Sequence, residues 1–180
     1  MEMKYIACFG DSLIEGYPFG TECSWCKIAE EGEDFRLLNY GVCGECCDEI
    51  FWRMEHTPLQ ENLYGIIFLG GANDALCGRP PQLTIQDIDR AAKFAAEHEL
   101  RFAVVLPLIS NDLELNRHLW EVTNLLKSKS YFFIDLQEGI GYGADELARA
   151  YVDGVHPTIA TYAKMGMIAK PQIEKFLGSE

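Results

Sequence analysis

Short apolar runs and amphipathic stretches alternate along most of the chain. The apolar runs are rich in Ile, Leu, Val and Phe, and they end close to glycine or a polar loop. Continuous apolar runs of this length are typical of strands that are buried on both faces of a sheet. We therefore expect strands at residues 4–9, 35–40, 63–69, 102–106 and 131–134.

The stretches between these runs carry apolar residues at every third or fourth position, the spacing of a helix with one buried face. Thr84 and Asp87 have the spacing of a short capping box and follow an Arg79-Pro80-Pro81 loop, so one helix is expected to begin at Thr84. Gly166 and Pro171 are expected to weaken the last helix. The other predicted helices cover residues 21–31, 45–54, about 115–126, 144–151 and 158–177.

Strands that alternate with helices predict a parallel sheet with helices on both faces. The expected fold class is α/β, a three-layer α/β/α sandwich of about five strands. At 180 residues, the chain is long enough for one domain, so residues 1–180 are interpreted as a single domain. Ligands of such sheets bind outside the carboxyl ends of the strands, and that edge is where a site is expected.

The net charge of the chain indicates which classes of binding partner are favoured. Fifteen Lys and Arg residues face 28 Asp and Glu residues, which gives a formal net charge of −13. This balance disfavours nucleic acid and membrane surfaces as partners and favours a neutral or cationic small molecule. The N-terminus lacks the pattern of a signal peptide, and the longest apolar run, residues 102–109, is too short to span a bilayer. These features predict a cytoplasmic protein.

The seven cysteines are an odd number in a chain without a leader pattern, which favours reduced thiols over a disulfide framework. Cys23 and Cys26 have the spacing of a redox motif, and Cys46 and Cys47 are adjacent. No histidine lies close enough in sequence to complete a familiar zinc pattern. Small half-buried thiols are therefore the preferred interpretation, and a thiol redox or metal protein is the least favoured of three functional hypotheses.

The polar residues of greatest chemical interest follow the predicted strands. Ser12 comes directly after the first strand, and a serine hydroxyl needs a nearby base to become a nucleophile. Three of the four histidines are most simply surface residues, whereas His156 follows Asp153 by three positions. A turn of this kind can bring the carboxylate back to the imidazole ring, where it would fix the tautomer and stabilise the imidazolium.

Attack of a serine on an ester creates an oxyanion that needs preorganised donors. Three candidates follow the first three strands: the backbone N–H groups of Ser12 and Gly44 and the side-chain amide of Asn73. Glycine allows close approach of the backbone to a substrate, and Gly70-Gly71 allows a sharp turn before Asn73. An ordinary turn is the alternative interpretation of each of these residues.

Taken together, four stretches resemble, in order, the sequence blocks of the SGNH or GDSL family of serine esterases and lipases, and they span nearly the whole chain. The resemblance implies a flavodoxin-like sheet and no metal or cofactor. It also implies that Ser12 is the nucleophile, that Ser12, Gly44 and Asn73 donate to the oxyanion, and that His156 is a base oriented by Asp153. The four stretches are Gly10-Asp11-Ser12-Leu13, Asn39-Tyr40-Gly41-Val42-Cys43-Gly44, Gly71-Ala72-Asn73-Asp74 and Asp153-Gly154-Val155-His156-Pro157.

Two cysteines depart from the family pattern without removing a catalytic atom. Cys43 stands where many relatives have serine, and Cys77 is expected to place a thiol near the pocket. The first hypothesis is a serine hydrolase of short-chain, notably acetyl, esters, because the chain shows no large insertion that would form a lid. The second is a catalytically silent module that binds a carbohydrate or another small ligand on the same fold. The natural ester and the oligomeric state are left open by the sequence.

Overall fold

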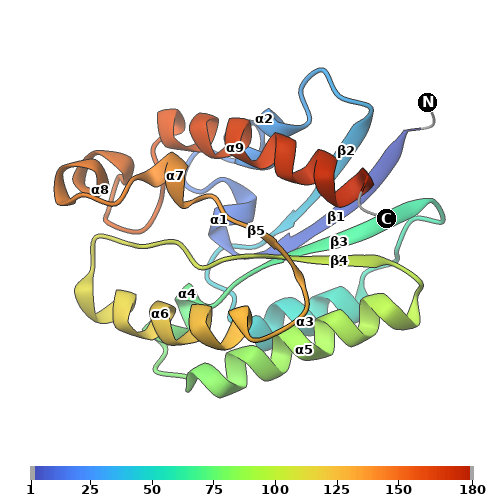
Figure 1. The fold of residues 1–180 in the computed structure, drawn as a ribbon, viewed down its shortest axis with the longest axis horizontal. Coiled ribbons are helices and arrows are strands. Elements are labelled where there is room, and N and C mark those ends of the chain that lie inside the picture. The colour runs from blue at the N-terminus through green and yellow to red at the C-terminus, as the bar shows by residue number, and fades with distance from the viewer. Residues whose placement is uncertain (1–2, 179–180) are drawn as a thin grey trace.

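A five-stranded sheet forms the centre of the molecule within residues 3–178, the part of the chain that the computed structural model describes (Figure 1). All neighbouring strands are parallel, and their order is β2-β1-β3-β4-β5. This is the flavodoxin-like order, so the predicted fold class is confirmed. The strands are β1 (Lys4–Gly10), β2 (Phe35–Gly41), β3 (Leu63–Leu69), β4 (Arg101–Val105) and β5 (Phe132–Ile134).

Helices cover both faces of this sheet (Figure 1). One face is covered by α1 (Ser12–Glu15), α2 (Trp25–Ala29), α7 (Gln137–Ile140), α8 (Ala144–Ala150) and α9 (Ile159–Gly178). The other is covered by α3 (Cys47–His56), α5 (Pro81–Glu97) and α6 (Leu113–Lys127), with α4 (Ala72–Leu76) against α5 and α6. A short 3₁₀ helix, η1 (Thr21–Cys23), precedes α2.

Strand β1 shows why the strands appear as unbroken apolar runs in the sequence. Ile6 and Cys8 belong to the core under α2 and α9, whereas Ala7 and Phe9 belong to the core under α3 and α5. All four side chains are fully buried. Because successive residues of a strand point to opposite faces, a strand covered on both sides needs an apolar residue at every position.

Three helix predictions differ from the structure. The helix expected at residues 21–31 is interrupted at Ser24, whose hydroxyl accepts a hydrogen bond from the Cys26 N–H and donates one to the Ile14 carbonyl. The helix expected to begin at Thr84 begins at Pro81, because proline fits the first turn of a helix, where its missing N–H is not needed. Gly166 and Pro171 lie within an unbroken α9, which packs along the sheet.

The loops at the carboxyl ends of the strands also contain more helix than predicted. Ser12 and Asn73, both expected in loops, lie in α1 and α4. These helices are four and five residues long, too short to show a periodic pattern. Within residues 3–178, none of the helices has both the length and the apolar character needed to cross a bilayer.

Candidate active site

Ser12 is the first residue of α1, directly after β1, and is only 5% exposed. The preceding residue, Asp11, is the N-cap of this helix, and its carboxylate accepts a hydrogen bond from the Leu13 N–H at 2.9 Å. A carboxylate at an N-cap satisfies one of the free N–H groups of the first turn. The hydroxyl of Ser12 is thereby fixed at the carboxyl edge of the sheet.

The structure brings Ser12, His156 and Asp153 together in a continuous chain of hydrogen bonds. The Ser12 Oγ lies 3.0 Å from the His156 Nε2, and the His156 Nδ1 lies 2.6 Å from the Asp153 Oδ2. The other carboxylate oxygen of Asp153 accepts bonds from the backbone N–H groups of Val155 and His156, at 3.1 and 2.8 Å. The turn therefore folds back on itself as its spacing predicted.

The contacts of Asp153 indicate which tautomer the neutral His156 ring adopts. Burial alone would raise the pKa of the Asp153 carboxyl, but the bonds from the His156 ring and from the backbone N–H groups outweigh it and lower this pKa. An ionised carboxylate only accepts hydrogen bonds, so the proton of the ring lies on Nδ1. The Nε2 of His156 is then free to accept the hydroxyl proton of Ser12.

The loop that carries His156 is held from several sides. Tyr151 and Pro157 form an antiparallel bridge that closes the base of the loop, and the Asn111 N–H donates to the Gly154 carbonyl at 2.8 Å. The edge of the Tyr17 ring packs against the imidazole, with ring centroids 4.7 Å apart. The imidazole therefore has a fixed place beside Ser12.

Gly44 and Asn73 supply donors near the same edge. Within the described residues, no acceptor is found for the backbone N–H of Ser12 or of Gly44. Gly44 has a φ of +88°, a conformation that favours glycine. The Asn73 amide donates one hydrogen to the Glu45 carbonyl at 2.9 Å, and its second hydrogen remains for another acceptor. These groups are the candidate oxyanion donors.

A buried ionic group lies behind Asn73. The side chain of Asp74 is fully buried, and its Oδ1 lies 3.1 Å from the Arg79 Nε, an ion-pair contact without hydrogen-bond alignment. The same guanidinium pairs with Asp48 and, at 2.7 Å, with Asp87. This group ties α4 to α3 and α5, and so fixes the start of the helix that carries Asn73.

Asp11 has an electrostatic environment of its own. Burial raises the pKa of its carboxyl to about 7, against the lowering effects of the Leu13 N–H and of His156. Its Oδ2 has no hydrogen-bond partner among the described residues. Asp11 also lines a small cavity of about 20 Å³, whose wall is otherwise mostly apolar. The remaining lining residues are Leu13, Leu69, Gly70, Ala72, Leu106, Pro107, Leu108, Ser110, Leu115, Leu119, Tyr151 and Val155.

The cysteines are not joined in disulfides, in agreement with the reduced thiols expected from the sequence. All seven are free thiols, and the Cys26 thiol contacts that of Cys8 in the core rather than Cys23. Cys77, which was expected near the pocket, is exposed at the end of α4.

Cys46 lies near the carboxylates of Asp48 and Glu49. Burial, and after it Asp74 and the Cys77 thiol, raise the pKa of its thiol to about 12, which disfavours the thiolate that a metal would need.

Two solved structures that are similar to this chain are assigned to the same family. A structure assigned to the lipolytic G-D-S-L family from Desulfitobacterium hafniense DCB-2 matches with a TM-score of 0.82 and 22% identity, covering 93% of this chain and 98% of that one. A member of the same family from Veillonella parvula DSM 2008 matches with a TM-score of 0.81 and 25% identity, over 92% of this chain and 96% of that one. The fold is that of the GDSL family.

A third similar structure is that of a carbohydrate acetylesterase family member from Sinorhizobium meliloti. Its TM-score is 0.77 at 18% identity, and the match covers 98% of this chain and 100% of that one. The resemblance predicted from the four sequence blocks is thus confirmed. No protein-family model matches the sequence, and no curated protein matches it.

Arg53 and Glu45 belong to the site region of this GDSL fold but are absent from the sequence-based prediction. The two side chains form an ion pair of 2.6 Å, and Glu45 follows Gly44 directly in the chain. A charged pair on a helix and a loop is common on protein surfaces, so their spacing in the sequence gives no signal of a special role.

Proposed function

We propose that this protein is a serine hydrolase that cleaves short-chain acyl esters through an acyl-enzyme intermediate. The observation that supports this most strongly is the chain of hydrogen bonds from Ser12 through His156 to Asp153, at 3.0 and 2.6 Å. The fold adds support, because similar structures include lipolytic G-D-S-L proteins and a carbohydrate acetylesterase family member.

In the first half of the reaction, the His156 Nε2 takes the proton of the Ser12 hydroxyl as the oxygen attacks the ester carbonyl. The imidazolium is stabilised by the ionised Asp153, which keeps the ring in the correct tautomer. The negative oxygen of the tetrahedral intermediate accepts hydrogen bonds from the Ser12 and Gly44 N–H groups and from Asn73. His156 then gives its proton to the departing alkoxide, and the acyl group stays on Ser12.

In the second half, water replaces the alcohol. His156 takes a proton from this water, whose oxygen attacks the acyl carbonyl, and the same three donors receive the new oxyanion. Return of the proton to the Ser12 oxygen releases the carboxylic acid and restores the hydroxyl. One base therefore serves both halves of the reaction.

The small cavity supports a short acyl group. Neither Ser12 nor His156 lines it, but two of its lining residues, Asp11 and Val155, are their sequence neighbours, so the cavity lies at the same edge of the sheet as the triad. Its volume of about 20 Å³ corresponds roughly to one water molecule or one methyl group. An acetyl group therefore fits better than a long acyl chain.

The direct test of this function is hydrolysis of p-nitrophenyl acetate by the wild type and by Ser12→Ala. Loss of the nucleophile is expected to lower kcat by about 10⁴-fold or more, because the triad acts as a unit, while the circular dichroism spectrum stays unchanged. Ser128→Ala is the matched control, because it removes a serine hydroxyl at the C-terminal end of α6, outside the triad and the cavity. Equal turnover by Ser12→Ala and the wild type would contradict the proposal.

A further inference from the structure

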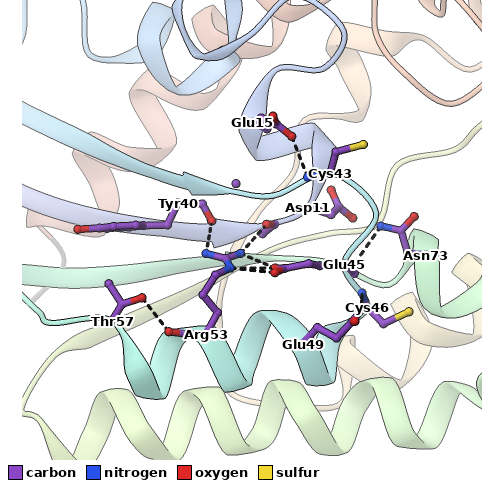
Figure 2. A network of polar contacts seen from close by, with 12 residues as sticks. Asp11, Glu15, Tyr40, Cys43, Glu45, Cys46, Glu49, Arg53, Thr57 and Asn73 are labelled. Carbon is purple, nitrogen blue, oxygen red and sulfur yellow. Dashed lines mark hydrogen bonds and ion pairs between the residues drawn. The ribbon is translucent and has the colours of Figure 1, made fainter.

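The guanidinium group of Arg53 contacts the chain segments that carry the candidate oxyanion donors. Arg53 projects from α3 toward the carboxyl ends of β1 and β2 (Figure 2). Its Nε and Nη2 bind the Glu45 carboxylate, with the shortest contact at 2.6 Å. Its Nη1 donates to the Tyr40 carbonyl at 2.8 Å, and its Nη2 also donates to the Gly10 carbonyl at 3.1 Å. The group thus contacts three separate segments.

Each of these segments leads to one donor. Gly10 lies two residues before Ser12, and Tyr40 lies near the end of β2, just before the loop that contains Gly44. Glu45 follows Gly44 directly, and its backbone carbonyl is the group that accepts the Asn73 amide at 2.9 Å (Figure 2). A displacement of Glu45 would therefore move both the Gly44 N–H and the orientation of Asn73.

The contacts of Arg53 require a guanidinium. Its planar, forked donors bind a carboxylate through two nitrogens and still reach two carbonyl oxygens, which a single ammonium group cannot do with the same geometry. The Cζ of Arg53 lies 5.7 Å from the centre of the Phe9 ring, which is stacked on Tyr40. Both Arg53 and Glu45 have side chains only 19% exposed, so water competes weakly for these bonds.

We propose that Arg53, acting through Glu45, is a positioning residue that sets the geometry of the oxyanion donors. The proposal rests on the proposed hydrolase function. Arg53 itself does not touch the substrate. It holds the segments around Gly10, Tyr40 and Glu45 at a fixed separation, so that the Ser12 N–H, the Gly44 N–H and the Asn73 amide converge on one point.

The first test compares kinetics in Arg53→Lys, Arg53→Met and Glu45→Gln. Residues that orient catalytic groups change activity by about 10- to 100-fold when they are replaced, so kcat for p-nitrophenyl acetate is expected to fall within that range in the Arg53 variants. KM is expected to stay within about threefold, because the donors act mainly in the transition state. The double variant Arg53→Met/Glu45→Gln should lose no more than Arg53→Met alone, because the two residues act as one unit.

A matched control separates positioning from general stability. Lys129 and Asp89 form an ion pair of the same length, 2.6 Å, at the opposite edge of the sheet, before β5. Lys129→Met removes that pair and is expected to leave kcat unchanged. Thermal unfolding of each variant shows whether it is folded, and activity is compared at a temperature at which all are folded.

A second readout responds to the oxyanion donors specifically. The sulfur of p-nitrophenyl thionoacetate fits poorly between donors that are placed for an oxygen, so the wild type should hydrolyse the oxygen ester faster. The ratio of the two rates should shrink about 10-fold or more in Arg53→Met, in line with the loss of one well-placed donor. A wild type without esterase activity would overturn the proposed function together with this proposal. An active wild type whose kcat and oxygen preference survive in Arg53→Lys and Arg53→Met would overturn the positioning role alone.

Discussion

At the scale of single residues, the carboxyl of Asp11 is the most unusual group near Ser12. It is buried, one of its oxygens has no hydrogen-bond partner in the described part of the chain, and its pKa is raised to about 7, first of all by burial. An acid whose pKa is higher in the folded than in the unfolded state binds protons more tightly when folded. Its ionisation therefore lowers the free energy of unfolding as the pH rises from about 4 to about 7.

Asp11→Asn should remove this dependence while its side-chain oxygen still caps α1. Below about pH 4, Asp11 is protonated in both the folded and the unfolded protein, so it does not affect the free energy of unfolding. Above about pH 7, it is ionised in both, and the free energy of unfolding is lowered by the full amount. The variant should thus gain stability over the wild type as the pH rises, by up to about 4 kcal/mol between pH 4 and pH 8. Urea unfolding at several pH values measures this gain.

The control for this prediction is Asp112→Asn, the same chemical change at the exposed N-cap of α6. A gain in stability with pH that appears in Asp11→Asn but not in this variant is due to the buried position of residue 11 and not to the change from carboxyl to amide itself. A difference between Asp11→Asn and the wild type that stays constant from pH 4 to pH 8 would contradict the environment described for Asp11.

At the scale of elements, α1 depends on how closely it approaches the end of β2. A Cβ added to Gly41, the last residue of β2, would lie 2.1 Å from the backbone nitrogen of Glu15 in α1. The Asn39 side chain bridges the same two elements, donating to the Ile14 carbonyl at 2.6 Å and accepting from the Gly41 N–H at 3.0 Å. Any side chain at position 41 would push α1, and Ser12 with it, away from the sheet.

Gly41→Ala should therefore lower both stability and activity. Overpacking of this kind costs about 1–3 kcal/mol, and a displaced Ser12 should lower kcat by about 10- to 100-fold. Chemical unfolding and p-nitrophenyl acetate hydrolysis measure the two effects. Gly178→Ala is the matched control, since a Cβ there meets no atom of residues 3–178 within 4 Å. A kcat in Gly41→Ala equal to that of the wild type would contradict the prediction, because it would mean that activity does not depend on the close approach of α1 to β2.

Strands and site blocks could be predicted from the sequence because each leaves a local pattern. Residues 63–69 were predicted as a strand with the observed bounds, because burial on both faces demands an unbroken apolar run. Helices α1 and α4 left no such pattern, since four or five residues complete barely more than one turn. Arg53 was missed because it binds the Tyr40 and Gly10 carbonyls, 13 and 43 residues away, and any residue type provides a carbonyl.

At the scale of the whole molecule, strand order explains why the site residues meet. Strand β1 lies between β2 and β3, so Ser12 emerges between the loop that carries Gly44 and the helix that carries Asn73. His156 reaches the same point from the loop between α8 and α9. The roles of these residues in catalysis stay predictions, but the topology places them at one edge, as expected for parallel sheets.

The proposed place of the acyl group, in the small cavity lined by Asp11 and Val155, gives a prediction for the whole protein. The rate constant kcat/KM should fall steadily from p-nitrophenyl acetate to butyrate to octanoate, because that cavity measures only about 20 Å³. Leu115→Ala shortens a side chain that lines this cavity and so enlarges the cavity. The ratio of kcat/KM for butyrate to that for acetate should therefore rise. A wild type that prefers octanoate would contradict the assignment of this cavity to the acyl group.

The central claim is that His156 activates Ser12 as a nucleophile. The most direct measurement is covalent labelling with a fluorophosphonate, followed by mass spectrometry of the peptides, because only an activated serine reacts rapidly. The account predicts one adduct, on Ser12, that is lost in Ser12→Ala and formed far more slowly in His156→Ala. An unlabelled wild type would indicate a silent binding module, and that result, or an adduct on another residue, would contradict the account.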